Sequence, residues 1–207
     1  MMDPVEIGIL GAGNIGRAFA QHLVKAGYRV QLANRRGPAS LASLVGELGP
    51  NAKAATASEV ARLKIVLVAI PWADLPEAMR DLPPWEGRIV IDANNHIIGF
   101  EGGQIRLADL RGRTSSEVFA EMVPGARVVK ALNTLFAELL AQEPRVENGR
   151  RVIFISGDDA VSKKTVSDLL ESVGFSPIDL GTLSVGGRLQ QAGGPLSVIN
   201  LIRISER

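Results

Sequence analysis

The segment GAGNIG at residues 11–16 decides the fold of this chain, together with the apolar run VEIGIL at residues 5–10 before it. A helical stretch follows at residues 15–26, and a second apolar run ends at residue 34. A strand, a Gly-x-Gly-x-x-Gly turn and a helix in this order are typical of a dinucleotide-binding unit. A plain structural turn is the alternative, and the strands on either side favour the nucleotide site.

Each glycine of this segment has a separate task. Gly11 permits the tight turn, Gly13 lets the backbone approach a pyrophosphate, and Gly16 lets the helix pack closely on the strand. We also expect a positive φ at Gly13, which a Val there would resist. The helix N-terminus then offers N–H groups and a partial positive charge to the phosphates.

The end of the second apolar run indicates which dinucleotide binds. NAD-specific folds carry an Asp or Glu there, which holds the ribose 2′-hydroxyl. This chain has Asn34, Arg35 and Arg36 instead. Guanidinium groups present forked donors that match phosphate oxygens, so the pattern favours the 2′-phosphate of NADP(H) over NAD(H). A solvated loop with two charges is the alternative.

Composition excludes several classes of function. The 23 basic and 22 acidic residues nearly cancel, which gives no reason to expect a nucleic-acid or membrane surface. The chain has no cysteine and only two histidines, so we expect no disulfide, thiolate site or multi-histidine metal site. No apolar stretch reaches membrane-spanning length, and the first residues do not resemble a signal peptide. We expect a cytoplasmic protein.

Strand-like and helix-like segments alternate along the chain, which predicts an α/β fold with a doubly wound, mostly parallel sheet of the Rossmann type. The expected strands are residues 5–10, 29–34, 52–54, 64–70, 88–92, 127–131, 152–156 and 176–180. Residues 99–112 read as a glycine-rich loop. We expect a dinucleotide-binding domain at residues 1–181 and a kinked helical C-terminal cap at residues 182–207, packed on it or on a dimer partner.

Ligands of doubly wound sheets cross the carboxyl ends of the strands, so the residues just after each strand carry the chemistry. Four such loops should surround the nicotinamide end of the cofactor. They hold Pro71 and Trp72; Asn94, Asn95 and His96; Asn133 and Thr134; and Gly157, Asp158 and Asp159.

Each of these loops has a structural alternative. Pro71 and Trp72 could only end a strand and pack a helix, and the asparagines could form a turn. Asp158 or Asp159 is most simply a helix N-cap, and Ser115 or Ser116 would cap the helix at residues 115–122. Lys130 lies inside an apolar strand, where we favour a buried partner over a proton donor.

The order of these motifs carries a family resemblance that covers nearly the whole chain. The glycine turn, the Asn-Arg-Arg segment, AIPW at residues 69–72, VKALNT at residues 129–134, SGDD at residues 156–159 and GFSPIDLG at residues 174–181 follow one another. Together they resemble the deazaflavin-dependent NADP reductase family, in its coenzyme F420-dependent type. That family also includes the cytosolic domain of the six-transmembrane ferric reductases.

The resemblance implies a single Rossmann domain that binds NADP(H) facing a flavin or deazaflavin ring, with direct hydride transfer between the rings. It implies that Gly11, Asn14 and Ile15 hold the pyrophosphate turn and that residues 70–72 border the nicotinamide ribose. Deazaflavin-using members of the family typically carry a His at the position of Asn133. This chain has Asn there, and so does the ferric-reductase branch. The family's Gly-Pro-Leu is Gly-Thr-Leu here, at residues 181–183.

These observations give a defined set of site residues. The predicted cofactor-binding residues are Gly11, Gly13, Asn14, Ile15, Gly16, Asn34, Arg35, Arg36, Ile70, Pro71, Trp72 and Asn94. The predicted substrate residues are Asn95, His96, Asn133 and Thr134. Ring-to-ring transfer needs orientation and exclusion of water more than acid–base groups, so we predict no catalytic side chain and no metal.

The leading hypothesis is an NADP(H)-dependent oxidoreductase that acts on a flavin, a deazaflavin or another small electron acceptor. One alternative is a carbonyl or imine reductase with His96 or Lys130 as proton donor. The other is a non-catalytic NADP(H)-binding redox sensor. We expect a homodimer with no nucleic-acid or membrane partner, and the apolar residues 196–204 are a candidate cover or dimer contact.

Overall fold

A computed structural model describes residues 5–204 of the chain. The strands of the main sheet are β1 (Glu6–Leu10), β2 (Arg29–Ala33), β3 (Ala52–Ala54), β4 (Ile65–Val68), β5 (Ile89–Asp92), β8 (Arg127–Lys130), β9 (Arg145–Val146), β10 (Gly149–Gly157), β11 (Ser176–Asp179) and β12 (Ile202–Ile204). The helices are α1 (Asn14–Lys25), α2 (Ala42–Leu48), α3 (Ala57–Val60), α4 (Leu75–Arg80), α5 (Ser115–Met122), α6 (Ala137–Leu140), α7 (Ala160–Ser172) and α8 (Gly186–Gln190). Two short 3₁₀ turns, η1 (Pro38–Leu41) and η2 (Trp72–Asp74), and the hairpin β6 (Ile97–Glu101) and β7 (Gln104–Leu107) complete the structure.

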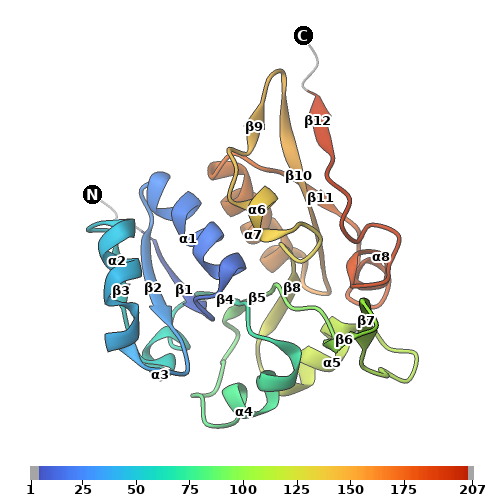
Figure 1. Cartoon of the computed structure of the whole chain (residues 1–207), viewed down its shortest axis with the longest axis horizontal. Helices are drawn as coiled ribbons and strands as arrows, with labels where there is room; N and C mark the ends of the chain where they lie inside the picture. Colours follow the sequence, from blue (N-terminus) through green and yellow to red (C-terminus); the bar gives the residue numbers. More distant parts are fainter. Residues whose placement is uncertain (1–4, 205–207) are drawn as a thin grey trace.

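The central sheet is doubly wound, as the alternation of segments predicts. Six parallel strands lie in the order β3-β2-β1-β4-β5-β8. This order reverses between β1 and β4, and that is where ligands of such sheets bind. Figure 1 shows the helices on both sides of the sheet. The Rossmann-type α/β fold is confirmed.

The core has two layers because the central strands are apolar on both faces. In β4, Ile65 and Leu67 pack with α1, α2, α6 and α7 on one side, and Val66 and Val68 pack with α3, α4 and α5 on the other. Such continuous apolar runs are typical of central parallel strands. They hold the carboxyl ends of the strands at one edge of a rigid sheet, where the site is expected.

The strand β10 runs opposite to its neighbour β8, which corrects one prediction. The strand follows β9 through a tight turn, and its residue Ser156 pairs with Lys130 while Gly157 pairs with Val129. Its carboxyl end therefore lies at the amino end of β8. Asp158 and Asp159 therefore lie toward the edge of the sheet opposite the predicted nicotinamide loops: Asp159 is 3.8 Å from Arg127, the first residue of β8, and is the N-cap of α7.

The glycine-rich residues 99–112 are not simply a loop. Strands β6 and β7 form an antiparallel hairpin in which Phe100 faces Ile105. The turn between them contains Gly102 and Gly103 with φ of 57° and 80°. Two successive glycines with positive φ are what a two-residue hairpin turn requires, so the glycines that suggested a loop form the turn of a hairpin.

The C-terminal segment differs from the expected helical cap. It contains one short helix, α8, followed by turns and by the strand β12, which pairs antiparallel with β10. Residues 196–204 hold no helix, because their final residues complete a three-stranded ribbon with β9 and β10 instead. This ribbon projects at the top of Figure 1.

Candidate functional site

The glycine turn between β1 and α1 has the geometry that its sequence predicts at two of its three glycines. Gly11 has φ of +102°, and a Cβ atom there would lie 2.1 Å from the carbonyl oxygen of Ala69. A Cβ atom on Gly16 would lie 2.0 Å from the carbonyl oxygen of Gly11. Both positions exclude any side chain because backbone atoms fill the space.

Gly13 differs from the expectation in its backbone and agrees with it in its surroundings. It is the N-cap of α1 with φ of −77°, so the predicted positive φ is wrong, and the left-handed residue is Gly11. A Cβ atom on Gly13 would have nothing within 4 Å. The space beside it is open, next to the first N–H groups of α1, which have no partner inside the helix. A pyrophosphate fits this cradle.

The Asn34 side chain shapes the loop after β2. Its Oδ1 accepts hydrogen bonds from the Arg36 backbone N–H at 2.9 Å and from the Ser40 hydroxyl at 3.1 Å. The side chain of Arg35 is 84% exposed, and its Nη1 lies 3.6 Å from Oδ2 of Asp74. This exposed ion pair is weak, so a phosphate dianion could replace Asp74 as the partner of Arg35.

Asn94 ties the loop after β4 to the loop after β5. Its Oδ1 accepts the backbone N–H of Ile70 at 2.8 Å. Its backbone N–H and Nδ2 both donate to Oδ1 of Asp92, at 2.9 and 2.8 Å. The Asn94 side chain is buried, and these bonds turn it toward the protein. Its geometry suits positioning of residues 70–72 better than direct contact with a cofactor.

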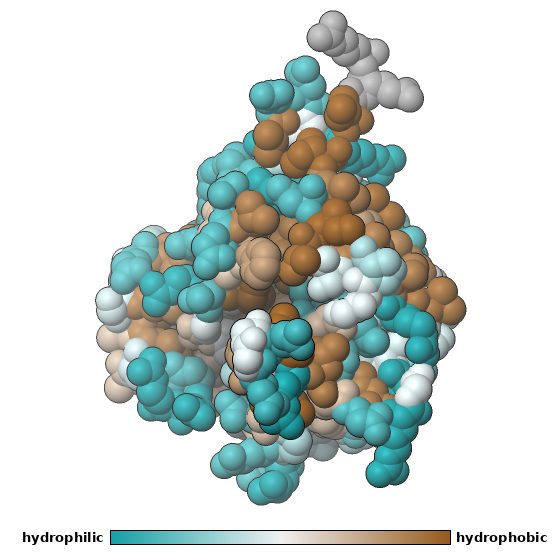
Figure 2. Space-filling model, turned by 45° about the vertical axis from the view of Figure 1, so that its right-hand side comes forward, coloured by the Kyte–Doolittle hydropathy of each residue, from teal (hydrophilic) through white to brown (hydrophobic). Residues whose placement is uncertain are grey.

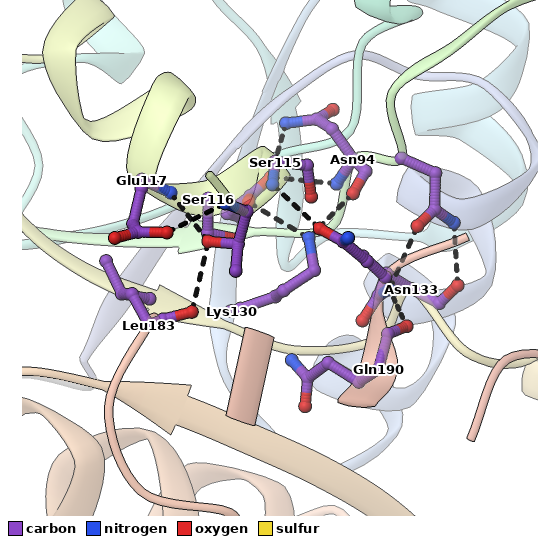
Figure 3. A network of polar contacts seen from close by, with 12 residues as sticks. Asn94, Ser115, Ser116, Glu117, Lys130, Asn133, Leu183 and Gln190 are labelled. Carbon is purple, nitrogen blue, oxygen red and sulfur yellow. Dashed lines mark hydrogen bonds and ion pairs between the residues drawn. The ribbon is translucent and has the colours of Figure 1, made fainter. Parts of the chain in front are cut away.

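Beneath Asn94 lies a fully buried ion pair, drawn in Figure 3. Lys130 and Asp92 face each other in register on neighbouring strands, with Nζ 3.2 Å from Oδ2 and both side chains 0% exposed. Nζ also donates to the carbonyl oxygen of Asn94 at 2.9 Å, and the Ser116 hydroxyl donates to Oδ2 of Asp92. Burial lowers the pKa of Lys130, and the Asp92 carboxylate partly offsets that.

A second set of amides joins the loops after β5 and β8 to the C-terminal segment. Asn133 Nδ2 donates to Asn95 Oδ1 at 3.0 Å and to the carbonyl oxygen of Gln190 at 2.7 Å. Asn95 Nδ2 donates back to the carbonyl oxygen of Asn133, and the Ala192 N–H donates to Asn95 Oδ1, both at 2.9 Å. Leu132, next to Asn133, has φ of +64°, a strained conformation that these bonds hold.

His96 is a buried ring and not an exposed acid. It is 5% exposed and lies edge to face with Trp72, with ring centroids 6.3 Å apart. Burial lowers the pKa of His96, and the charge of Lys130 lowers it further. Both effects favour the neutral form of the ring.

The structure brings together the strand-end loops of β2, β1, β4, β5 and β8 at one edge of the sheet. Thr134 joins them, buried, with its carbonyl oxygen accepting the N–H of Val198. Lys130 has the buried structural role that the sequence favoured. The helix α5 is capped by Thr114 and not by Ser115 or Ser116, because its hydroxyl accepts the N–H of Glu117.

Sequence reasoning missed three residues that shape the site: Asp74, Asp92 and Gln190. Asp92 could have been found, because a lysine inside an apolar strand needs a carboxylate partner and Asp92 ends the adjacent strand. Asp74 and the backbone of Gln190 carry no comparable signal. They reach the site through the tertiary fold alone.

Residues 6–96 match the sequence profile of the family described as NADP oxidoreductase, coenzyme F420-dependent. The chain is 41% identical to a hypothetical protein of Sinorhizobium meliloti of known structure, with a TM-score of 0.90 over 96% of both chains. It is 30% identical to a proposed F420-dependent NADP reductase from Arthrobacter sp. FB24, with a TM-score of 0.76 over 86% of both chains. The chain belongs to the coenzyme F420-dependent NADP oxidoreductase family.

Members of this family are NADP-dependent oxidoreductases, and so is this chain. It is also 29% identical over 181 residues to the metalloreductase STEAP3 of Rattus norvegicus, which covers 86% of this chain and 34% of that protein. The chain thus spans about a third of the curated metalloreductases it matches. Within residues 5–204, no helix is long and apolar enough to cross a membrane.

Proposed function

We propose that this family member transfers a hydride between NADP(H) and a flavin or deazaflavin ring that stacks at the carboxyl edge of the sheet. NADP(H), when bound, supplies or receives the hydride. The backbone around Gly13 and the first turn of α1 hold the pyrophosphate, and Arg35 and Arg36 hold the 2′-phosphate. Residues 70–72 border the nicotinamide ribose, and the amides of Asn95 and Asn133 orient the acceptor.

One observation supports a ring-to-ring reaction over carbonyl or imine reduction. The three titratable side chains that lie at or next to the carboxyl ends of β5 and β8 are all withdrawn from solvent. Asp92 and Lys130 are fully buried and paired with each other, and His96 is buried with its pKa lowered. A general acid must reach the proton acceptor in a substrate, and side chains buried in this way are poorly placed to do so. Direct hydride transfer can take its proton from solvent.

The test measures NADPH oxidation with FMN, FAD and the deazaflavin as acceptors, in the unchanged protein and in His96→Gln. We expect turnover with at least one of these rings. In the variant we expect the turnover rate to fall by less than about a hundredfold, which is the smallest loss typical of removing a general acid. Turnover with carbonyl compounds alone, abolished in His96→Gln, would make the chain a carbonyl reductase. Tight NADPH binding without turnover on any acceptor would make it a sensor.

The proposed partner in assembly is a second copy of the chain. Six large apolar side chains stand exposed along the segment that covers the carboxyl edge and along the ribbon: Phe136, Val198, Ile199, Leu201, Ile202 and Ile204. Figure 2 shows apolar side chains from the middle of this face to the tip of the ribbon. Contiguous apolar surface of this kind favours association, and β12 is an edge strand.

Light scattering after gel filtration tests this assembly. We expect a dimer for the unchanged protein and a monomer for the double variant Leu201→Glu, Ile204→Glu. The matched control is Val161→Glu, which changes an exposed apolar residue on α7, away from the ribbon, and should stay dimeric. A monomeric unchanged protein contradicts the proposal.

A further inference from the structure

The buried Lys130–Asp92 pair lies under the loop that borders the proposed nicotinamide ribose, yet neither side chain reaches it. We infer that this pair is a positioning device for NADP(H): it fixes Asn94, which in turn fixes the backbone of Ile70. This inference rests on the proposed cofactor site. Its evidence is a set of hydrogen bonds that converge on one residue (Figure 3).

Asn94 is held at every polar group. Its backbone N–H and Nδ2 donate to Oδ1 of Asp92, and its carbonyl oxygen accepts from Nζ of Lys130. Its last acceptor, Oδ1, takes the N–H of Ile70. The carboxylate of Asp92 is held in turn by Lys130 and by the Ser116 hydroxyl of α5. The orientation of the Asn94 amide is therefore set by the ion pair and is transmitted to the β4 loop.

The β4 loop also contacts the phosphate turn. A Cβ atom on Gly11 would lie 2.1 Å from the carbonyl oxygen of Ala69 and 3.2 Å from Cγ1 of Ile70, so the β4 loop packs directly against the glycine turn. A shift of the Ile70 backbone would move the nicotinamide end of the site. The loop after β2 follows a strand two positions away, on the other side of β1. Its Arg35 meets the segment after β4 through the exposed ion pair with Asp74, which lies beyond Ile70, so we expect the 2′-phosphate half of the site to be displaced little.

A buried ion pair is a poor source of stability, because its desolvation cost offsets most of its attraction. Replacement by apolar residues of similar volume is often neutral for the fold. This makes stability and positioning separable by experiment. The pair can be replaced as Asp92→Leu, Lys130→Met without leaving a lone buried charge.

The experiment measures dissociation constants for two probes by titration, independently of turnover. NADPH occupies the whole site, and adenosine 2′,5′-bisphosphate occupies only the half that includes the 2′-phosphate. In the double variant we expect NADPH to bind about tenfold more weakly, the factor for about one lost hydrogen bond, and the half-site probe to bind as before. A merely structural role would weaken both probes together or neither.

A mutant cycle checks that the pair acts through Asn94. We expect Asn94→Ala to give the same loss, and the triple variant to bind NADPH no more weakly than Asn94→Ala alone. Additive losses would overturn the inference, and so would unchanged NADPH binding in the double variant. If the double variant does not fold, the cycle of Ser116→Ala with Asn94→Ala carries the same expectation.

Arg151 provides the matched control for a buried cation. It lies in β10, and its guanidinium donates to the side-chain oxygens of Asn200 and Gln142. Arg151→Met should lower the melting temperature and leave both dissociation constants unchanged. An unchanged protein that does not bind NADPH would refute the proposed function itself, whereas NADPH binding that ignores all these variants would refute only the positioning role.

Discussion

At the scale of single residues, two glycines of one turn have different roles: we expect one to be needed for folding and the other for binding. Gly11 has φ of +102° and no room for a Cβ atom, whereas Gly13 has φ of −77° and open space beside it. We expect Gly11→Ala to lower the melting temperature strongly. Gly13→Val should keep a normal far-UV circular dichroism spectrum and lose NADPH binding, because its side chain occupies the space proposed for the pyrophosphate.

Thermal shift with and without NADPH measures both effects at once. Normal stabilisation of Gly13→Val by NADPH would show that the phosphate site is misplaced. A normal melting temperature for Gly11→Ala would show that the turn adapts in a way that this structure does not show.

Cofactor preference is also decided by single residues. Charge-assisted hydrogen bonds contribute roughly 1.5–3 kcal/mol each, so Arg35→Glu should weaken NADPH binding by tens-fold or more while NADH binding changes little. The control is Asp74→Asn, which removes the exposed carboxylate 3.6 Å from Arg35. It should bind NADPH at least as tightly as the unchanged protein. Fluorescence titrations give these constants, and equal affinities for NADPH and NADH in the unchanged protein would refute the preference.

At the scale of elements, the sequence predicts strands better than it predicts their direction. The central parallel strands can be predicted because they are apolar on both faces and end in polar loops, as β4 and β5 do. The direction of β10 depends on the preceding turn from β9, and its two-residue partner strand gives almost no pattern. The hairpin of β6 and β7 is not predicted, because the glycines that form its turn indicate a loop.

The site residues divide in the same way, into those that local sequence predicts and those that depend on how the strands pair. Local turns and strand ends place Gly11, Arg35 and Asn133 correctly at the carboxyl edge of the sheet. A lysine inside an apolar strand signals that Lys130 needs a carboxylate partner, but its pairing with Asp92 itself depends on the register between β5 and β8, which no local pattern fixes. The contact of Asn133 with α8 joins residues 57 positions apart.

Helix α8 supports the site through one close contact, which gives a prediction at this scale. A Cβ atom on Gly186 would lie 2.7 Å from the Cβ atoms of both Leu180 and Ser156. Gly186→Ala should displace α8, whose Gln190 carbonyl holds Asn133, and so raise the KM for the acceptor more than the KM for NADPH.

The matched control for this helix is Gly46→Ala. Gly46 lies inside α2 with nothing within 4 Å of a Cβ atom, and alanine there should stabilise the fold by roughly 0.5–1 kcal/mol without a kinetic effect. Steady-state kinetics with the acceptor identified by the screen measure both variants. Equal KM values in Gly186→Ala and the unchanged protein would exclude a role of α8 in acceptor binding.

At the scale of the whole molecule, acid should weaken the fold in two separate ranges of pH. The pKa values of His22 and His96 both lie below their ordinary value of 6.5, mainly because both rings are buried. The unfolded chain therefore takes up protons at these rings before the folded chain does, and stability falls as the pH drops below 6.5.

The second range belongs to two carboxyl groups. Glu59 and Asp159 have lowered pKa values because hydrogen bonds from Thr56 and Ser162, respectively, favour their charged forms. They stabilise the fold above their unfolded values of 4.5 and 3.8, and that contribution is lost only as the pH falls further.

Melting temperatures from about pH 8 to about pH 2 test this division, because the histidines titrate in the upper range and the carboxyl groups in the lower one. The double variant His22→Gln, His96→Gln should flatten the curve near pH 6 and leave the loss at lower pH unchanged. Gln suits position 22 because Nε2 of His22 lies 2.7 Å from the carbonyl oxygen of Leu140, so the neutral ring donates there and an amide can replace it. A curve that stays equally steep near pH 6 in this variant would place the titrating groups elsewhere, since these are the only two histidines of the chain. A flat curve in the unchanged protein would mean that both rings titrate alike in the folded and unfolded chains, which their burial argues against.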